Sequence, residues 1–502
     1  MFKILRATCS DRIYVRNTPQ DLKAALIKRF THHNPQRAKL RAMGRGEWRE
    51  PHNYTTYDQP DADTFAFQRG GLHDARVIAN RMGYGFQFAD LRVAPPNPRL
   101  VPRKAARPYQ LDALNVALTK QNCLILGGTG SGKTYIGLLV AAKCNTTTLI
   151  VVWNAELFDQ WLNCIENDLG IKRDAVGKIG AGKFTIAPIT VAMQQTLARL
   201  TGAKRQLVRE SFGCVILDEA HRAPAATFRE AIDMMPAKYR IALTADERRP
   251  DRKEFLTYDL FGQVAYKIDP NMLVREGYVV PVDVHIVPTG APFEWYRDGE
   301  DRDFTRLQEE VVTNDVRNAI VVSAVRAAAL RGTTIVFCNR REHCERLTSE
   351  LRQHFSVGTM LGDKDQRAEL KRTIVGLKDG SVRVGVGTVQ MIGTGLDIPD
   401  VSYGVLAAPI GKNEQLFNQI RGRLCRAASG KYRATLVWMH DERAFGDSAV
   451  RNLFKWNDGR GDVVYENAGV PVKVTREWLA ARAELGEYAD GAFCLTPEAF
   501  RF

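Results

Sequence analysis

One segment of the sequence has the residue types and the spacing of a phosphate-binding loop. GGTGSGKT follows the apolar run CLIL and precedes the helical pattern YIGLLVAAK. Glycines let a loop wrap backbone N–H groups around phosphates, and the following helix presents its positive end to them. Strand, loop and helix in this order are the setting that the pattern requires. We therefore predict that a nucleotide is bound through the loop residues Gly127, Gly128, Thr129, Gly130, Ser131, Gly132, Lys133 and Thr134.

Five further roles follow from the chemistry of this loop and of a second segment, VILDEAH. Lys133 would neutralise the β- and γ-phosphates, and the hydroxyl of Thr134 would hold Mg²⁺. VILDEAH places Asp218 and Glu219 at the end of an apolar run, where a parallel sheet exposes side chains to its ligand crevice. We expect Asp218 to bind Mg²⁺ through water and Glu219 to polarise the attacking water. His221 is suited to linking the nucleotide site with neighbouring segments.

A third segment, QIRGRLCR, contains three arginines that helical geometry separates. Its surroundings carry an apolar helical stripe formed by Leu416, Phe417, Ile420 and Leu424. At about 100° per residue, Gln419, Arg423 and Arg426 share a different face. Arg421 points away from that face. We expect solvent or a nucleic-acid phosphate to be the partner of Arg421.

Apolar runs that alternate with helical patterns surround these segments and must position them. One block extends from CLILGG to RIALTA, and a second extends from TTIVFCN to RATLVWM. Continuous apolar strands bounded by glycine and separated by helices are typical of parallel sheets covered on both faces. The pattern predicts two doubly wound α/β domains in series, with a ligand cleft between them.

Changes in composition suggest further limits along the chain. The stretch VAPPNPRLVPRKAARP is rich in proline and reads as a linker. The predicted parts are a basic N-terminal domain at 1–95, a linker at 96–108, α/β domains at 109–282 and 283–456, and a C-terminal tail at 457–502.

The positive charge is concentrated near the start of the chain. The formal net charge is +14, and the first fifty residues hold 12 Lys and Arg against 4 Asp and Glu. This excess indicates a polyanionic partner. Charge that serves only solubility is the alternative that composition leaves open.

Composition also narrows the class of protein. The 502 residues are 45% hydrophobic and 25% charged, which is typical of a soluble globular protein of several domains. No run approaches the roughly 18 apolar residues of a membrane span, and the first residues turn polar too soon for a secretory signal. We therefore expect a cytoplasmic protein without a membrane partner. The nine cysteines are scattered without a CxxC pair, which argues against a zinc site and a disulfide framework.

Taken in order, the motifs resemble those of superfamily-two helicases. GGTGSGKT, VILDEAH, LTAD, GTGLDIP and QIRGRLCR look like motifs I, II, III, V and VI of that family. RPYQLDA resembles the segment that reads adenine, with Arg107 and Gln110 as the implied contacts. The resemblance implies two tandem RecA-like domains that use ATP and Mg²⁺ and hold a nucleic-acid strand.

The resemblance also implies roles for residues of the second domain. Arg423 and Arg426 would reach across the cleft to the γ-phosphate bound by Lys133, where a planar and permanently charged guanidinium suits the transferring group. Gln419 would lie on the same catalytic face. In GTGLDIP, Gly395 and Asp397 would help link the nucleotide to the strand.

The sequence departs from the family pattern at two places. Motif Ia has Trp153 and Asn154 where Pro-Thr is usual, so a hydroxyl contact to phosphate is replaced by an amide or lost. Motif III ends in Asp246 where Ser or Thr is common. Coupling between hydrolysis and strand movement would then differ in detail.

Two further stretches suggest a branch of the family. FGQVAYKIDPNMLVREGYVVPV resembles the link between RecA-like domains in XPB-like helicases, and NPQRAKLRAMGRGEWRE, with Gly44, Gly46 and Trp48, resembles the small basic domain of phage UvsW helicases. The resemblance implies an ATP-dependent DNA helicase or translocase that remodels forks, Holliday junctions or R-loops in replication, recombination or repair. An RNA helicase and the motor subunit of a restriction or nuclease assembly stay open as alternatives.

Overall fold

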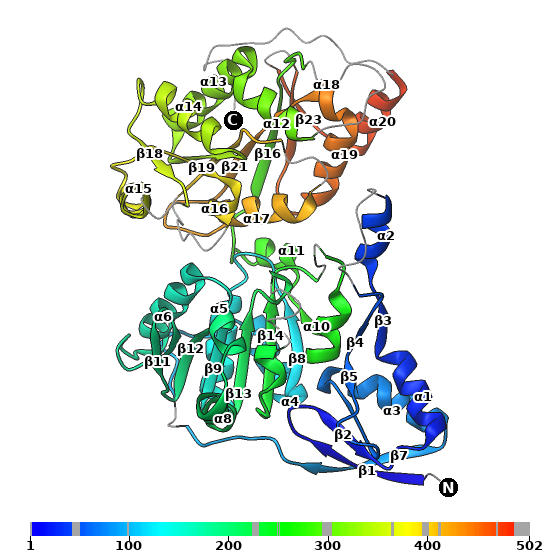
Figure 1. Ribbon diagram of the computed structural model, residues 1–502. Helices are drawn as coiled ribbons and strands as arrows, with labels where there is room; N and C mark the ends of the chain where they lie inside the picture. Colours follow the sequence, from blue (N-terminus) through cyan, green and yellow to red (C-terminus); the bar gives the residue numbers. More distant parts are fainter. Residues whose placement is uncertain are drawn as a thin grey trace. The chain divides into compact units, whose positions relative to one another are not determined.

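The computed structural model forms two compact units. One comprises Met1–Gly128 with Gly132–Ile268, and the other comprises Thr129–Ser131 with Asp269–Phe502. Figure 1 shows the chain coloured from blue to red. The structure describes residues 3–42, 51–97, 100–222, 230–247, 249, 251–293, 304–362, 366–393, 401–409, 413–467 and 470–485.

An eight-stranded sheet forms the centre of the first unit. Its order is β11-β10-β12-β9-β13-β14-β8-β15, and only β10 and β11 pair antiparallel. The central strands are mostly apolar and buried, as expected for a parallel sheet that is covered on both faces. The strands are β8 Asn122–Leu126, β9 Thr148–Val152, β10 Gly177–Gly180, β11 Lys183–Thr185, β12 Ile189–Met193, β13 Cys214–Asp218, β14 Tyr239–Thr244 and β15 Val264–Lys267.

The helices of this unit begin where local signals predict. Gly132, with a positive φ, directly precedes α5, and the side chain of Asn154 caps α6 by accepting from the N–H of Leu157. A Cβ on Gly137 of α5 would lie 2.7 Å from the Trp161 ring of α6, so glycine allows these helices to pack closely. The helices are α4 Pro108–Lys120, α5 Lys133–Lys143, α6 Ala155–Leu169, α7 Gln194–Ala198, α8 Gly202–Ser211, the 3₁₀ turn η2 Ala220–Arg222, and α10 Glu254–Phe261.

The N-terminal region folds as a small α+β domain within the first unit. Its five-stranded sheet has the order β5-β6-β2-β1-β7, and β3 and β4 form a separate two-stranded sheet. Leu22 and Leu26 of α1 and Ala75 and Ala79 of α3 pack on the buried face of the larger sheet. Gly44, Gly46 and Trp48 lie outside the described residues. The elements are β1 Lys3–Cys9, β2 Ile13–Arg16, α1 Gln20–Arg29, β3 Thr31–His33, α2 Pro35–Ala42, β4 Asn53–Thr55, β5 Tyr57–Asp58, β6 Thr64–Phe67, η1 Arg69–Gly71, α3 Leu72–Arg81 and β7 Tyr84–Asp90.

The second unit contains another eight-stranded sheet. Its order is β18-β19-β17-β20-β21-β16-β22-β23, and only β22 and β23 pair antiparallel. The strands are β16 Val282–Pro288, β17 Thr334–Cys338, β18 Val357–Met360, β19 Val384–Thr388, β20 Tyr403–Leu406, β21 Ala434–His440, β22 Val463–Asn467 and β23 Val470–Lys473. The helices are α11 Pro270–Arg275, α12 Phe304–Thr313, α13 Asp315–Arg331, α14 Arg341–Leu351, α15 Arg367–Asp379, α16 Val389–Gly393, α17 Glu414–Leu424, α18 Glu442–Phe445, α19 Asp447–Trp456 and α20 Arg476–Leu485.

Two largely parallel sheets confirm the predicted pair of doubly wound α/β domains and the small α+β domain that precedes them. The domain limits at residues 95, 108, 282 and 456 stay predictions, because the two compact units combine several of the predicted parts. Part of the predicted tail joins the second sheet as β22 and β23. Within the described residues, the structure has no helix that is long and apolar enough to cross a membrane.

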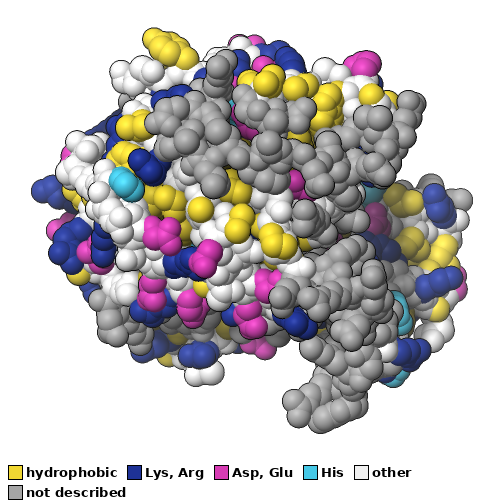
Figure 2. Space-filling model, turned by 90° about the horizontal axis from the view of Figure 1, so that it is seen from above, with side chains coloured by type: hydrophobic (Ala, Val, Ile, Leu, Met, Phe, Trp, Pro, Cys, Tyr) yellow, Lys and Arg dark blue, Asp and Glu magenta, His cyan; other side chains and the backbone are white. Residues whose placement is uncertain are grey.

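Charged side chains of both signs share the surface. On the described part of the face in Figure 2, Lys and Arg lie interspersed with Asp and Glu. Ion pairs along α14 have the same character, with Arg341 2.7 Å from Glu345 and Arg346 3.3 Å from Glu350. Such exposed pairs contribute little to stability, and a mixed surface of this kind favours solubility.

Candidate nucleotide-binding and hydrolysis site

The phosphate loop joins β8 to α5 in the predicted setting. The N–H of Gly127 donates to the carbonyl of Thr244 at 2.9 Å, which ties the start of the loop to the end of β14. Gly130 and Gly132 have φ angles of +85° and +74°, a region that glycine adopts without strain. Since α5 begins at Lys133, its first N–H groups have no partner within the helix and can bind an anion. The loop therefore has the geometry of a phosphate cradle.

The side chain of Lys133 lies between the loop and the DEAH segment. Its Nζ atom is 3.5 Å from the carbonyl oxygen of Gly128 and 3.8 Å from Oε1 of Glu219. Lys133 is only 9% exposed. The ammonium group thus offers a positive charge at the point where the predicted phosphates and the predicted catalytic carboxylate would meet.

The two residues predicted to contact adenine lie at the start of α4. Gln110 is buried, and its Oε1 accepts the N–H of Arg107 at 2.9 Å. A Cβ on Gly132 would lie 2.6 Å from Nε2 of Gln110, so this amide reaches the phosphate loop itself. Nη1 of Arg107 donates to the hydroxyl of Tyr109 at 3.4 Å. The contacts of Arg107 and Gln110 with a nucleotide stay predictions.

Asp218 ends β13 as a buried carboxylate with two donors. Nε1 of Trp161 donates to Oδ2 at 2.8 Å, and the N–H of Glu219 donates to Oδ1 at 2.9 Å. Burial, and then the nearby charge of Glu219, raise the pKa of Asp218 to about 6, while Lys133 opposes the increase. A cation placed beside Asp218 would therefore stabilise a carboxylate that its surroundings leave under-compensated.

The sequence did not reveal the role of Trp161. It lies in α6, is fully buried and holds one oxygen of Asp218 from a helix 57 residues away. A buried tryptophan usually finds a partner for its N–H, and this tendency was the only signal available in the sequence. We interpret Trp161 as a residue that fixes the orientation of the Asp218 carboxylate.

Glu219 is held in an unusual backbone conformation. Its φ is +51°, which is rare for a residue with a side chain and costs roughly 1–3 kcal/mol. Its side chain is 24% exposed, in contrast to the buried Asp218. The strained backbone turns this carboxylate out of the strand direction and leaves it accessible to a ligand or water.

His221 joins the DEAH segment to motif III. Its Nδ1 lies 2.9 Å from Oγ1 of Thr244 and 3.3 Å from Oε2 of Glu219. The Thr244 hydroxyl donates to the carbonyl of Asp246 at 2.7 Å, so it can accept a proton from Nδ1 of His221. Two predicted segments of the first unit, the DEAH segment and motif III, thus meet at this histidine.

The arginines of QIRGRLCR differ in burial along α17. Asn413 caps this helix by accepting the N–H of Leu416 at 3.0 Å. Gln419, Arg423 and Arg426 are partly exposed, whereas Arg421 is buried. The difference in exposure agrees with the prediction that Arg421 lies on a different helical face from Gln419, Arg423 and Arg426.

The expected partner of Arg421, solvent or a nucleic-acid phosphate, is wrong. Its Nη1 donates to the carbonyl of Trp456 at 3.0 Å, its Nη2 donates to Oδ1 of Asn418 at 2.9 Å, and its guanidinium lies 5.6 Å from the centre of the Phe417 ring. Burial, and then the charge of Arg460, lower the pKa of Arg421 to about 9. The missed signal is spacing, because Arg421 follows buried Phe417 by four residues on the same helical face. Arg421 anchors α17 to the end of α19.

The end of QIRGRLCR pairs with the segment that follows α11. Val279 and Arg426 form an antiparallel bridge, and the N–H of Val280 donates to the carbonyl of Cys425 at 2.8 Å. Arg423 and Arg426 belong to the second unit, and their approach to a nucleotide on Lys133 stays a prediction. Gly395 and Asp397 lie outside the described residues.

Two family models match the chain. Residues 103–248 match the type III restriction enzyme, res subunit, and residues 317–428 match the helicase conserved C-terminal domain. The chain resembles superfamily-two DNA helicases. The two matched ranges include the phosphate loop, the DEAH segment, motif III and QIRGRLCR.

Individual relatives agree with this family resemblance. The DNA 3′-5′ helicase XPB of Kineococcus radiotolerans is 29% identical over 210 residues, which are 40% of this chain and 38% of that protein. The chain spans about half, or less, of the length of the first curated relatives that it matches. The predicted likeness to XPB-like helicases is thus confirmed, as a likeness.

Solved structures support the fold. A fragment described as an HsdR subunit of a type I restriction enzyme from Vibrio vulnificus YJ016 aligns with a TM-score of 0.54 and 21% identity, over 73% of this chain and 69% of that chain. T4 UvsW aligns over 92% of this chain and 99% of its own, with 14% identity and a TM-score of 0.42. The alignment with the HsdR fragment shows a shared fold alone. The TM-score of the UvsW alignment is too low for any conclusion to rest on it.

Proposed function

We propose that this protein is an ATP-dependent DNA helicase or translocase. The observation that carries the proposal is the cluster formed by Lys133, Asp218, Glu219 and His221, which lies beside a phosphate loop within the family match at residues 103–248. A match to the helicase conserved C-terminal domain follows at residues 317–428. Phosphoryl transfer to water needs positive charge beside the phosphates and a carboxylate that can reach the attacking water. Lys133 is a buried cation, and the carboxylate of Glu219 is partly exposed. A chain that kept the fold as a passive clamp would have no need for the strained Glu219.

Different residues of the first unit would bind the phosphates, orient the attacking water and hold Mg²⁺ during hydrolysis. Loop N–H groups and Lys133 hold the β- and γ-phosphates, and Glu219 orients the attacking water. Asp218 and Thr134 would hold Mg²⁺, which supplies positive charge to the phosphate oxygens when bound. Both residues fit this role, since Thr134 lies in the first turn of α5 next to Lys133 and Asp218 is a buried carboxylate with a raised pKa.

The second unit would complete the site when ATP is bound. Arg423 lies in α17 and Arg426 two residues after its end, and both side chains are partly exposed. Charge from these groups would stabilise the transferring phosphoryl group, with Gln419 beside them. Closure on ATP and reopening after hydrolysis would then move the two units along a strand, because each nucleotide state favours a different conformation.

DNA is the proposed polymer, and branched DNA is the proposed preference. The XPB relative is by name a DNA helicase, and the basic N-terminal domain suits phosphate contacts that are salt-sensitive and largely independent of sequence. The domain would hold one duplex arm of a fork or junction while the two units act on a single strand.

ATPase and unwinding assays on single strands, forks, four-way junctions and RNA hybrids test this function. We expect stimulation by DNA, fastest unwinding on branched substrates, and loss of both activities in Lys133→Ala. Stimulation by RNA alone would favour an RNA helicase. ATPase and translocation without strand separation would favour the motor of a nuclease assembly. Hydrolysis that survives in Lys133→Ala would contradict the mechanism.

A further inference from the structure

A buried carboxylate of the first unit is shared with the N-terminal domain. The Asp259 side chain, on α10, is 1% exposed. Its oxygens lie 2.9 Å from Nη2 of Arg29, 2.6 Å from Nε2 of His32 and 2.5 Å from Oγ1 of Thr56. All three partners come from the N-terminal domain. A buried charge with one partner removed is strongly unfavourable, so this set of contacts fixes the domain at α10.

The N-terminal domain follows the chain before and along α10 at three more points. The rings of His32 and Phe255 stack with centres 4.3 Å apart. Nζ of Lys253, a buried lysine, donates to the hydroxyl of Tyr54 at 2.6 Å. Gln36, on the basic helix α2, donates through Nε2 to the carbonyl of Asp251 at 3.1 Å. The contacts thus extend from residue 251 to residue 259.

The same stretch reaches the DEAH segment. Arg249 is buried and forms a two-point ion pair with Asp251, at 2.9 Å from Nε and 3.0 Å from Nη2. Its Nη1 donates to the carbonyl of Ala220 at 3.3 Å. Ala220 stands between Glu219 and His221. A continuous set of polar contacts therefore connects Gln36 on α2 with the backbone beside the proposed catalytic carboxylate.

A second attachment of the N-terminal domain lies near the start of β14. Nη2 of Arg12 lies 3.0 Å from Oδ2 of Asp233, and Arg69 donates to the carbonyl of Ala237 at 2.5 Å. Both contacts lie just before β14, at the opposite end of that strand from Thr244. These contacts of Arg12 and Arg69 lead to the start of β14, whereas the polar contacts near α10 continue to the DEAH segment.

We propose that Asp259 is a positioning residue through which nucleic acid bound by the N-terminal domain sets the rate of ATP hydrolysis. The inference rests on the proposed function. Asp259 keeps the N-terminal domain and α10 together. When nucleic acid binds to the domain and displaces it, the backbone from Arg249 to Lys253 moves with it. The hydrogen bond from Arg249 to Ala220 then carries the shift to Glu219. Such a link is a coupling free energy between two sites, and it can be measured as one.

The test compares Asp259→Asn with Asp233→Asn in the full chain. Each variant removes one interface carboxylate that faces an arginine of the N-terminal domain. ATPase rates with and without a forked DNA oligonucleotide, the affinity for that fork by fluorescence anisotropy, and thermal unfolding are measured for both. We expect Asp259→Asn to lose at least about fivefold of the DNA stimulation. The basal ATPase rate of Asp259→Asn and its affinity for the fork should stay within about twofold of the wild-type values. The DNA stimulation of Asp233→Asn should also stay within about twofold of wild type.

Three outcomes contradict the coupling. They are full stimulation in Asp259→Asn, equal loss in both variants, and loss in Asp259→Asn that is explained by weaker DNA binding. A wild-type protein that binds the fork without faster hydrolysis contradicts the proposed function as well, which separates the two failures.

A milder variant protects the test against unfolding of Asp259→Asn. Tyr54→Phe removes only the hydroxyl that Lys253 contacts, and Tyr54 lies in β4, within the same attachment. We expect a smaller loss of stimulation in the same direction, with an unchanged basal rate. Wild-type stimulation in both Tyr54→Phe and a folded Asp259→Asn would overturn the inference.

Discussion

The carboxyl edges of the two large sheets carry different polar clusters. In the first unit, β13 ends at Asp218, and the side chain of the following Glu219 is 24% exposed. In the second unit, Asp441 directly follows β21, and its carboxylate pairs with Arg317 of α13. The side chains of Arg317 and Asp441 are both 0% exposed. Similar sheets therefore place one accessible cluster and one closed cluster at the same edge.

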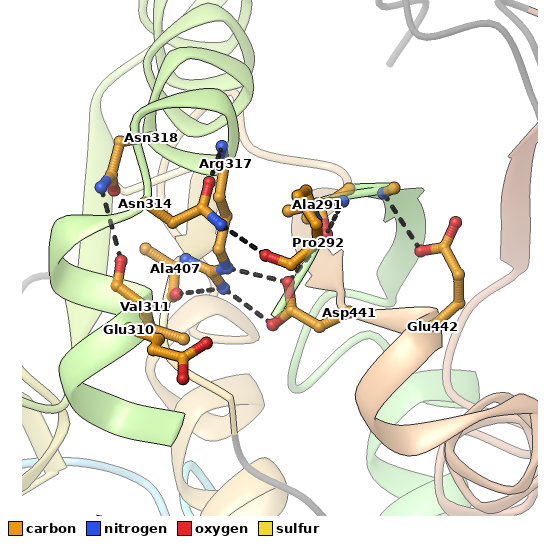
Figure 3. A network of polar contacts seen from close by, with 12 residues as sticks. Ala291, Pro292, Glu310, Val311, Asn314, Arg317, Asn318, Ala407, Asp441 and Glu442 are labelled. Atoms are coloured by element: carbon orange, nitrogen blue, oxygen red, sulfur yellow. Dashed lines mark hydrogen bonds and ion pairs between the residues drawn. The ribbon is translucent and has the colours of Figure 1, made fainter. Parts of the chain in front are cut away.

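Figure 3 shows why the second cluster is closed. The Arg317 guanidinium lies between Asp441 and the carbonyl of Ala407, at 2.8 Å and 3.1 Å from the two carboxylate oxygens and 2.7 Å from the carbonyl. The hydroxyl of Thr289 donates to Oδ1 of Asp441 at 2.8 Å. Charges are matched here, whereas Asp218 lies beside a second carboxylate, Glu219, whose charge adds to burial in raising the pKa of Asp218. The comparison teaches that neighbouring carboxylates with one accessible member mark the edge that suits a cationic ligand.

The largest expected effect concerns an accessible arginine of the second unit. Arg426→Ala should lower ATP hydrolysis by about 10³–10⁵-fold, or roughly 4–7 kcal/mol of barrier, because charge on the transferring phosphoryl group loses its partner. ATP binding should stay nearly unchanged. Single-turnover hydrolysis and nucleotide titration measure the two quantities.

Buried Arg421 provides the matched control. Arg421→Met should keep most of the hydrolysis per folded molecule but lower the melting temperature, since two carbonyl acceptors lose their donor. Normal turnover in Arg426→Ala, or loss of turnover equal to it in Arg421→Met, would erase the distinction between accessible and buried arginines.

The next effect concerns the closed cluster. Arg317→Met should destabilise the protein by about 3–5 kcal/mol, because it leaves the buried Asp441 charge without its partner. Urea unfolding measures this loss. The double variant Arg317→Met with Asp441→Leu should regain much of the stability, since no charge stays buried. A loss under about 1 kcal/mol in the single variant would show that the edge is open to water.

A smaller effect is expected at the support of the open cluster. Trp161→Phe removes the N–H that holds Oδ2 of Asp218 and should lower hydrolysis by about 10–100-fold. Trp438→Phe, at a buried tryptophan of the second unit, is the control and should keep the wild-type rate. Equal rates in the two variants would mean that Trp161 does not orient the carboxylate.

The most gradual effect, and the smallest at any one pH step, is a pH dependence of stability near the closed cluster. Burial, and then the charges of Arg317 and Arg346, lower the pKa of His343 to about 3, and Nε2 lies 2.8 Å from Oδ1 of Asn318. The unfolded chain has a histidine pKa of about 6.5, so it binds more protons than the folded chain between those values. Stability should therefore rise with pH across that window and level off above it, by up to about 1.4 kcal/mol per pH unit.

Unfolding free energies at several pH values measure this contribution. His343→Gln should flatten the dependence, whereas the same change at exposed His354 should leave it. An unchanged slope in His343→Gln would show that His343 is not a buried neutral group in the folded protein.

Local patterns in the sequence were enough to identify the fold and much of the candidate site. Apolar runs flanked by glycine predicted the strands, because a strand covered on both faces needs an apolar side chain at nearly every position. The phosphate loop and the DEAH segment were predictable because their residues act together within a few positions of the chain. Helical spacing also separated Arg421 from Gln419, Arg423 and Arg426.

The sequence could not decide which charged groups are accessible. The residue type arginine does not show whether the side chain is exposed or buried. Arg421 was predicted to contact solvent or a phosphate, but it is buried and donates to the carbonyl of Trp456. Trp161 and Asp218 are 57 residues apart, Arg317 and Asp441 are 124 apart, and Thr56 and Asp259 are 203 apart. Partners at such separations meet only when whole elements pack, and packing decides the burial that sets the strength of a charge. The sequence thus determined the local chemistry and the strand pattern, while the tertiary structure decided which charges are matched, closed or left accessible.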